Sequence, residues 1–229
     1  MKKGTLIVID GSDGSGKATQ VKRILNRLRK EGKKVRTVDF PMYYKNFFGR
    51  FIGECLRDKK YNFLATHAKI ASVLYAVDRW ETKEKIEKWL SDGCIVIANR
   101  YVSSNQIHQA GKLKNIRERR EFLKWLDTME YGVFGLPRPT LVLYLSVPVK
   151  LSQELIKHRD KLQQRKYLRK KKDVHESSLL FLENSRKSAL KLVGELNNFV
   201  KIECSSSGVL YSKKIIHEKV YSEIIKVLK

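Results

Sequence analysis

A glycine-rich segment near the N-terminus has the residue types and the spacing of a phosphate-binding loop. Gly11, Gly16 and Lys17 follow the pattern G-x-x-x-x-G-K, between an apolar run and a helical pattern. Glycines let backbone N–H groups turn toward an anion, and a lysine ammonium neutralises the terminal phosphates. We therefore predict a site for the phosphates of ATP or GTP, formed by Gly11, Ser12, Asp13, Gly14, Ser15, Gly16, Lys17, Ala18 and Thr19.

Position 18 departs from this pattern. Ala18 stands where the pattern has Ser or Thr, although Thr19 follows it. The usual hydroxyl binds Mg²⁺, which bridges the phosphates of the nucleotide during phosphoryl transfer. The departure therefore concerns the metal more than the binding of phosphate.

Three more segments carry side chains suited to nucleotide recognition. Phe40–Tyr44 and Asn99–Gln109 each follow an apolar run, and Asp78–Glu81 lies within a helical pattern. In open α/β sheets, ligands bind beyond the carboxyl ends of the strands. There an arginine can hold a phosphate, and an amide can pair with the edge of a base. The cluster that begins at Asn99 therefore has the groups that nucleotide recognition needs.

Apolar runs alternate with helical patterns along the chain. This alternation predicts an α/β fold with a parallel five-stranded sheet flanked by helices and joined by right-handed crossovers. The predicted strands are Thr5–Ile9, Lys34–Phe40, Cys94–Ala98, Leu141–Val147 and Phe199–Cys204. The predicted helices are Val21–Leu28, Phe47–Leu56, Leu64–Leu90, Ile116–Met129, Lys150–His158, Glu176–Leu196 and Lys214–Leu228.

Length and cysteine usage limit the classes of protein. The chain has 229 residues, enough for one sizeable domain, and no apolar run long enough to cross a membrane. The N-terminus leads into a strand without a signal peptide, and Cys55, Cys94 and Cys204 lack the spacing of a metal site. We therefore expect buried thiols and a reducing, cytoplasmic location.

The net charge is strongly positive. Lysine and arginine number 48 against 24 acidic residues, which gives a formal net charge of +24. Such a surface attracts polyanions without specificity, including nucleotides and nucleic acid. Aromatic residues do not interleave with the basic runs as they do in proteins that stack single-stranded bases. Charge alone therefore does not identify a nucleic-acid-binding protein.

Taken together, these motifs resemble those of the thymidylate kinases, which are phosphate-loop kinases of nucleoside monophosphates. The likeness rests on motifs in the family's order and spacing, namely Asp13, Phe40-Pro41, Asp78-Arg79, Asn99-Arg100-Tyr101 and Ser104-Asn105. It implies a three-layer P-loop NTPase fold, one kinase domain over residues 1–229, and a short mobile lid near residues 160–176. It also implies phosphorylation of dTMP to dTDP by ATP with Mg²⁺, and a homodimer.

The resemblance implies roles for residues around ATP. Lys17 and the loop amides hold the ATP phosphates, and Arg159 lies over adenine. Catalytic charge comes from Lys17, from Arg100 and from an arginine of the lid. Arg165 and Arg169 are both candidates for that last role, and the sequence does not choose between them.

The metal site differs from the family pattern at two positions. Ala18 and Asn99 stand where the family has a hydroxyl and an aspartate. An asparagine retains an oxygen but lacks the charge that supports a bound cation. The resemblance then leaves Asp13 and Glu176 as the residues expected to support Mg²⁺.

The resemblance also implies a binding site for dTMP. Arg79 bonds a thymine carbonyl, Asn105 bonds the ring N–H, Tyr75 stacks on the base, and Arg100 grips the phosphate. The full set of implied contacts is Asp13, Phe40, Tyr43, Tyr75, Arg79, Arg100, Ser104, Asn105 and His108.

One departure leaves the substrate open. His108 stands where the family often has a tyrosine that disfavours ribonucleotides, so a kinase of another deoxynucleoside monophosphate is an alternative. Met42 also departs from the family, since many members have Arg there. The net charge motivates an alternative of another class, a nucleotide-regulated nucleic-acid-binding P-loop protein without kinase activity.

Overall fold

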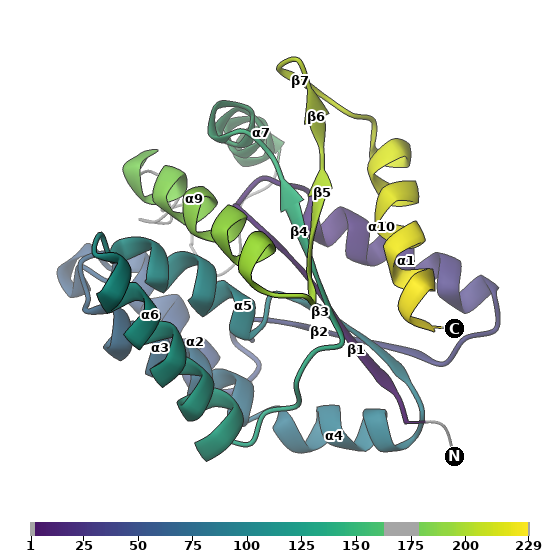
Figure 1. Ribbon diagram of the computed structural model, residues 1–229, viewed down its shortest axis with the longest axis horizontal. Coiled ribbons are helices and arrows are strands. Elements are labelled where there is room, and N and C mark those ends of the chain that lie inside the picture. The colour runs from purple at the N-terminus through teal and green to yellow at the C-terminus, as the bar shows by residue number, and fades with distance from the viewer. Residues whose placement is uncertain (1–2, 163–178, 229) are drawn as a thin grey trace.

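The computed structural model describes residues 3–162 and 179–228, with the side chains of residues 59 and 158–162 outside that description. Five parallel strands form one sheet in the order β2-β3-β1-β4-β5 (Figure 1). They are β1 (Thr5–Gly11), β2 (Val35–Asp39), β3 (Ile95–Asn99), β4 (Leu141–Ser146) and β5 (Phe199–Glu203). The predicted parallel sheet of five strands is confirmed.

Helices cover both faces of this sheet (Figure 1). α1 and α10 pack on one face, and α4 and α9 pack on the other. The α-helices are α1 (Lys17–Lys30), α2 (Phe47–Arg57), α3 (Ala68–Trp80), α4 (Lys83–Ser91), α5 (Val102–Ser104), α6 (Ile116–Asp127), α7 (Val149–Leu162), α9 (Leu179–Glu195) and α10 (Lys213–Leu228). Shorter helical turns span Lys59–Tyr61, Asn105–Gln109, Ala110–Lys112 and Thr128–Val133.

The side chains of β1 explain why helices lie on both faces. Ile7 and Ile9 pack with α1 and α10, whereas Leu6 and Val8 pack on the opposite face with α4 and α9. All four side chains are buried. Because both faces are covered, the strand is a continuous apolar run and does not alternate between apolar and polar residues.

The predicted helix over Leu64–Leu90 is wrong, because the structure divides this segment into α3 and α4. Thr82 is the N-terminal cap of α4. At the break, the Glu81 carboxylate accepts hydrogen bonds from the backbone N–H groups of Phe47 (3.3 Å) and Phe48 (3.0 Å), at the start of α2. Apolar periodicity continues across the turn because both helices bury one face, so periodicity does not locate the break.

A short antiparallel hairpin follows β5 and was not predicted. Its strands are β6 (Ser205–Ser206) and β7 (Val209–Leu210). The two residues between them, Ser207 and Gly208, both have left-handed backbone, with φ of 48° and 76°. Two consecutive left-handed residues are the conformation that a two-residue type I′ hairpin turn requires.

The cysteines agree with the sequence prediction. Cys55, Cys94 and Cys204 are buried and carry free thiols. Burial raises the pKa of the Cys204 thiol to about 12, which makes this thiol a poor nucleophile. Separately, none of the described helices combines the length and the apolar character that a membrane crossing requires.

Candidate active site

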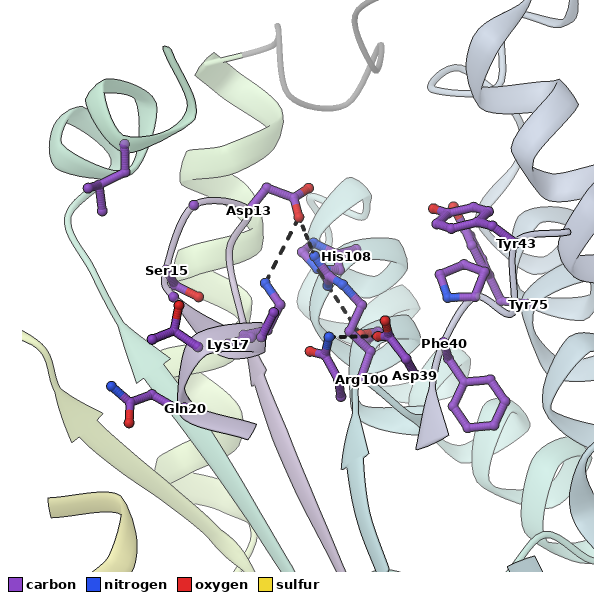
Figure 2. A pocket seen from close by; sticks show the side chains of 18 of the residues that line it. Asp13, Ser15, Lys17, Gln20, Asp39, Phe40, Tyr43, Tyr75, Arg100 and His108 are labelled. Atoms are coloured by element: carbon purple, nitrogen blue, oxygen red, sulfur yellow. Dashed lines mark hydrogen bonds and ion pairs between the residues drawn. The ribbon is translucent and has the colours of Figure 1, made fainter. Parts of the chain in front are cut away.

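A cavity of about 790 Å³ opens at the carboxyl ends of β1, β2 and β3 (Figure 2). The phosphate loop lines one part of it, and α3 lines another. The structure therefore brings the two predicted nucleotide sites into one cavity. The predicted residues that line it are Asp13, Gly14, Ser15, Gly16, Lys17, Ala18, Thr19, Phe40, Tyr43, Tyr75, Arg79, Arg100, Ser104, Asn105 and His108.

The phosphate loop is held in shape by a residue that is distant in the sequence. Gly14 and Gly16 have left-handed backbone, with φ of 80° and 87°. A Cβ at Gly14 would lie 2.5 Å from the backbone oxygen of Ser152 in α7, so only glycine fits there. The Ser152 hydroxyl donates to the backbone oxygen of Asp13 and lies 3.2 Å from the Ser12 hydroxyl. The glycine at position 14 is therefore required by packing against α7.

Lys17 begins α1 and is largely buried. Its ammonium donates to the backbone oxygens of Gly11 (2.9 Å) and Ser12 (2.8 Å) and lies 3.9 Å from a carboxylate oxygen of Asp13. Gly11 and Ser12 are absent from the described cavity lining, and their carbonyls position this lysine. A cation and a helix N-terminus therefore meet at the loop, as an anion site requires.

Arg100 follows β3 and reaches toward the loop. Its backbone is left-handed (φ 66°), which is uncommon for a residue with a side chain and recurs at functional sites. The guanidinium donates to Asp13 (2.7 Å), to the ring of His108 (2.9 Å) and to Ser104 (3.3 Å). Burial lowers the pKa of Arg100, but the charges of Asp13 and Asp10 outweigh burial and raise the pKa above its ordinary value. Arg100 is therefore a permanent cation within the cavity.

The His108 ring is neutral. Burial, and then the charge of Arg100, lower its pKa to about 3. Because Arg100 donates to Nε2, the ring proton lies on Nδ1, which donates to Ser185 Oγ at 3.0 Å. The ring stacks on Phe181, with centroids 5.8 Å apart. Ser185 and Phe181 belong to α9, so α9 supports Arg100 through His108. Neither Ser185 nor Phe181 was predicted from the sequence.

Asp10 is a third residue near the cavity that was not predicted from the sequence. It is fully buried, and its carboxylate accepts hydrogen bonds from the hydroxyls of Ser103 (2.6 Å) and Ser104 (2.8 Å) and from the backbone of Gly11 (2.8 Å). These contacts join the end of β1 to the helical segment after β3. An acid at the end of an apolar strand was the available signal, since a buried carboxylate needs partners.

Arg79 and Glu130 form a buried ion pair on the α3 side of the cavity. Two N–H groups of Arg79 donate to the two Glu130 oxygens, each at 2.7 Å. Burial lowers the pKa of Arg79, but Glu130 raises it above its ordinary value. Asn105 donates to Glu130 (2.8 Å) and to the backbone oxygen of Ser72 (3.1 Å). Glu130 therefore orients both predicted base-contacting residues, and no local pattern links it to Arg79, 51 residues away.

The aromatic residues predicted to contact the base are anchored by the surrounding structure. Phe40 is buried against Tyr101, with ring centroids 5.9 Å apart, and Tyr75 packs on Phe63 at 5.8 Å. The carboxylate of Asp78 accepts hydrogen bonds from the backbone N–H of Met42 and from the side-chain amide of Asn46. The Asp78 side chain therefore ties the segment after β2 to α3.

β2 and β3 end in a polar pair at the edge of the cavity. The amide nitrogen of Asn99 donates to the Asp39 carboxylate at 2.6 Å. Burial raises the pKa of Asp39, with Arg100 acting in the opposite direction. The predicted metal-site residue Asp13 lines the same cavity, whereas Glu176 lies outside the described residues. Within the described part of the chain, no group of three or more His, Cys, Asp or Glu side chains is close enough together to hold a metal ion.

One part of the cavity lining was not predicted at all. Leu210, Tyr211, Lys213 and Ile216 line the cavity together with the start of α1. The side chain of Gln20 in α1 donates to the backbone oxygen of Lys213 at 3.2 Å, which joins α10 to the first turn of α1, next to the phosphate loop. The hairpin and the start of α10 therefore extend the loop's side of the cavity.

Three predicted residues of the lid region lie outside the described residues. They are Arg165, Arg169 and Glu176, and most of the predicted lid lies there with them. Arg159 lies in α7, but its side chain is not among those described. Their roles stay predictions.

Comparisons with known proteins agree with the motifs and with the fold. A model of the family described as Thymidylate kinase matches residues 9–215. The thymidylate kinase of Mycobacterium tuberculosis is 30% identical over 149 residues, which are 65% of this chain and 69% of that protein. The Plasmodium falciparum thymidylate kinase is 28% identical over 81% of this chain and 85% of its own length. That of Thermosipho africanus is 29% identical over 93% of this chain and 97% of its own length. The chain therefore belongs to the thymidylate kinase family.

Proposed function

We propose that the protein transfers the γ-phosphoryl group of ATP to dTMP, which yields ADP and dTDP. The observation that carries the proposal is one cavity lined by the phosphate loop, by Arg100 and by the base-facing residues Arg79 and Asn105. Direct transfer requires two nucleotides bound with their phosphates adjacent, which removes the entropic cost of an encounter. Membership of the thymidylate kinase family supports ATP and dTMP as the two nucleotides.

The acceptor side combines a neutral base pocket with a cation for the phosphate. Arg79, neutralised by Glu130, presents N–H groups to the uncharged base, and Tyr75 provides a stacking surface. Arg100 binds the dTMP phosphate through charge-assisted hydrogen bonds. The proposal gives further contacts with dTMP to Asp13, Phe40, Tyr43, Ser104, Asn105 and His108.

The donor side supplies the charge that the reaction needs. Lys17 and the loop N–H groups bind the β- and γ-phosphates of ATP. An oxygen of the dTMP phosphate attacks the γ-phosphorus in line, and it needs no general base because it is already anionic. Lys17 and Arg100 stabilise the negative charge on the transferring group. Arg165 and Arg169 remain candidates for the lid arginine, and Arg159 for the contact with adenine.

Mg²⁺ fits the oxygen-rich edge of the cavity. Asp13, Thr19, Asp39 and Asn99 line this region, and Asn99 Oδ1 is enclosed without a hydrogen-bond partner among the described residues. Mg²⁺ binds oxygen ligands and keeps several waters. Asp13 and Asp39 would hold the hydrated ion, together with Glu176 from outside the described residues. When bound, Mg²⁺ neutralises charge on the β- and γ-phosphates.

We also propose that two copies of the chain associate through α2 and α3. Phe47 and Phe51 of α2 and Ile70 and Trp80 of α3 are exposed, and the two helices pack against each other. Clustered apolar side chains on a surface mark protein–protein contacts. Light scattering after size-exclusion chromatography should give a dimer mass for the wild type and a monomer mass for Phe47→Asp. A wild-type monomer at micromolar concentration contradicts the dimer.

The kinase proposal is tested by coupled measurement of ADP formation with a panel of monophosphates. We expect the highest kcat/KM with dTMP among dTMP, dUMP, dCMP, dGMP and the ribonucleotide of thymine. Lys17→Met should abolish turnover, whereas Lys22→Met, at an exposed position of the same helix, should leave it unchanged. Faster turnover of another monophosphate would replace dTMP as substrate. A folded wild-type protein without turnover would contradict the activity itself.

A further inference from the structure

The ends of β2 and β3 present a carboxylate and an amide to the cavity. Asp39 and Asn99 are register partners in the parallel pairing of these strands, and both line the cavity. The amide nitrogen of Asn99 donates to Asp39 Oδ1 at 2.6 Å. β3 pairs directly with β1, which carries the phosphate loop, and β2 is one strand further out. β3, the strand beside the loop, thus ends in the uncharged Asn99, and the carboxylate Asp39 ends β2.

This arrangement bears on how a nucleotide-bound metal is held. In P-loop nucleotide hydrolases, Mg²⁺ is held by a hydroxyl of the loop and by a carboxylate that follows a neighbouring strand. In this chain, the loop has Ala18 at the hydroxyl position and β3 ends in Asn99. An amide oxygen can accept a hydrogen bond from a metal-bound water, but it supplies no net charge. The Asp39 carboxylate lies directly beside Asn99, because these two residues are opposite each other in the pairing of β2 with β3.

The hydrogen bonds of the pair orient both side chains. The N–H group of Asn99 faces Asp39, which directs Asn99 Oδ1 away from it, and that oxygen is enclosed without a partner among the described residues. An enclosed oxygen without a hydrogen bond lowers the stability of the folded protein unless a water or an ion interacts with it. The Asn99 oxygen therefore has room for one more partner, such as a metal-bound water.

The surroundings of Asp39 place it among the phosphate-binding cations. Burial raises the pKa of Asp39, whereas the charges of Arg100, Lys45 and Lys17 act in the opposite direction, and Figure 2 shows Asp39 beside Arg100. Asp39 forms no ion pair within 4.0 Å with any of these cations among the described residues, and Arg100 already has Asp13 at 2.7 Å. Asp39 is thus not needed to neutralise Arg100, and its carboxylate remains available to a cation in the cavity.

We propose that Asp39 supplies from β2 the carboxylate charge that holds the hydrated metal of the ATP complex, with Asn99 as its positioning residue. The carboxylate of the pair lies at the end of β2 and the amide at the end of β3, so the pair carries one negative charge. This inference rests on the proposed function, since it requires a metal–nucleotide complex in the cavity. Ala18 and Asn99 therefore mark a rearranged metal site and not a lost one.

The test measures how strongly a metal and a nucleotide favour each other's binding. Calorimetry gives the affinity of the full-length protein for AMP-PNP with and without Mn²⁺, and the ratio of the two affinities is the metal enhancement. Mn²⁺ prefers the same oxygen ligands as Mg²⁺. Asp39→Asn should lower the metal enhancement about tenfold, the typical effect of removing a group that supports a metal through its ligands. Its affinity for metal-free AMP-PNP should not fall.

A double variant separates the charge from the position. Asp39→Asn combined with Asn99→Asp returns the carboxylate to β3 and keeps an amide opposite it, so the metal enhancement should recover most of its wild-type value. Asp92→Asn is the matched control, since it removes the same charge at an exposed position before β3, outside the described lining of the cavity. It should leave the enhancement unchanged. Circular dichroism confirms the fold of each variant.

Two outcomes overturn the proposal. An unchanged enhancement in Asp39→Asn shows that another group holds the metal. Equal losses in Asp39→Asn and in the double variant show that Asp39 acts through its place in β2 and not through the charge of the pair. Neither outcome depends on turnover, because no acceptor nucleotide is present. Failure of the kinase proposal is instead seen in the panel of monophosphates.

Discussion

Two arginines line the same cavity in different surroundings. Arg79 is 2% exposed, and both of its contacts with Glu130 are 2.7 Å long. Arg100 is 15% exposed, and its contacts with Asp13, His108 and Asp10 range from 2.7 to 3.5 Å. Among the described residues, the Arg79 guanidinium thus hydrogen-bonds to Glu130 alone, whereas the Arg100 guanidinium contacts several side chains.

The difference matches two kinds of ligand. A guanidinium paired bidentately with one carboxylate offers hydrogen bonds without net charge, which suits the uncharged edge of a base. A guanidinium held by contacts of unequal length can exchange the longer ones for a phosphate oxygen. The left-handed backbone of Arg100 adds to this contrast, because strained backbone is retained where function requires it. We infer that the Arg79 pair contributes mainly to stability and base recognition, and Arg100 to phosphate binding and turnover.

The largest expected effect is on stability at the Arg79 pair. Glu130→Ala leaves Arg79 buried and unpaired, which should lower the free energy of unfolding by about 3–5 kcal/mol in urea denaturation. The control is Asp127→Ala, which breaks the exposed bidentate pair with Arg138 and should cost less than about 1 kcal/mol. If Glu130→Ala does not fold, Glu130→Gln keeps the shape and should destabilise in the same direction. Equal losses at the buried and exposed pairs contradict the comparison.

The next effect is on catalysis at Arg100. Arg100→Ala should lower kcat/KM for dTMP by about 10²–10³-fold, the typical cost of removing one donor that stabilises transition-state charge. It should change stability less than Glu130→Ala does. Arg100→Lys keeps the charge but loses the planar fork, so an intermediate rate is expected. Steady-state kinetics with dTMP varied gives both parameters, and a loss below tenfold removes Arg100 from the catalytic assignment.

A smaller effect concerns pH and His108. The folded protein holds the pKa of His108 at about 3, well below its value in the unfolded chain, so protonation favours unfolding. Stability should therefore decrease as pH falls below about 6.5, by up to about 1.4 kcal/mol per pH unit from this residue. His108→Gln keeps an acceptor for Arg100 and removes this contribution. Urea denaturation between pH 5 and 7.5 compares the two slopes, and identical slopes contradict the neutral ring.

The smallest effect tests whether α9 supports Arg100. Ser185→Ala removes one neutral hydrogen bond to His108, worth about 0.5–1.5 kcal/mol, so KM for dTMP should rise about 2- to 10-fold. Ser188→Ala is the control on the same helix, because Ser188 donates to the backbone oxygen of Gln106 and not to His108. It should leave KM unchanged. Equal shifts in KM indicate a general effect of α9.

Much of the candidate site could be predicted from local sequence. The residues from Gly11 to Thr19 are contiguous, so phosphate binding by this loop can be predicted from the sequence alone. Arg100 and Asn105 follow a strand, where α/β sheets place ligands. Glu130 and Ser152 carry no such local signal, since each acts through a contact with a segment far away in the chain.

The helix boundaries show the same limit. Apolar periodicity predicted one helix from Leu64 to Leu90, because α3 and α4 both bury one face. The break is stabilised by Glu81, which accepts hydrogen bonds from the start of α2. A contact between two helices that are separate in sequence has no periodic signature, so periodicity could not reveal it.

The sequence by itself determined the sheet, the phosphate loop and the resemblance to thymidylate kinases, because these depend on contiguous residues. Only the tertiary structure decided how charges are matched across segments. It paired Arg79 with Glu130, kept His108 neutral against Arg100, and set Asp39 beside Asn99. The physical reason is that the charge and orientation of a side chain depend on burial and on neighbouring groups, and the packing of strands and helices determines which groups are neighbours.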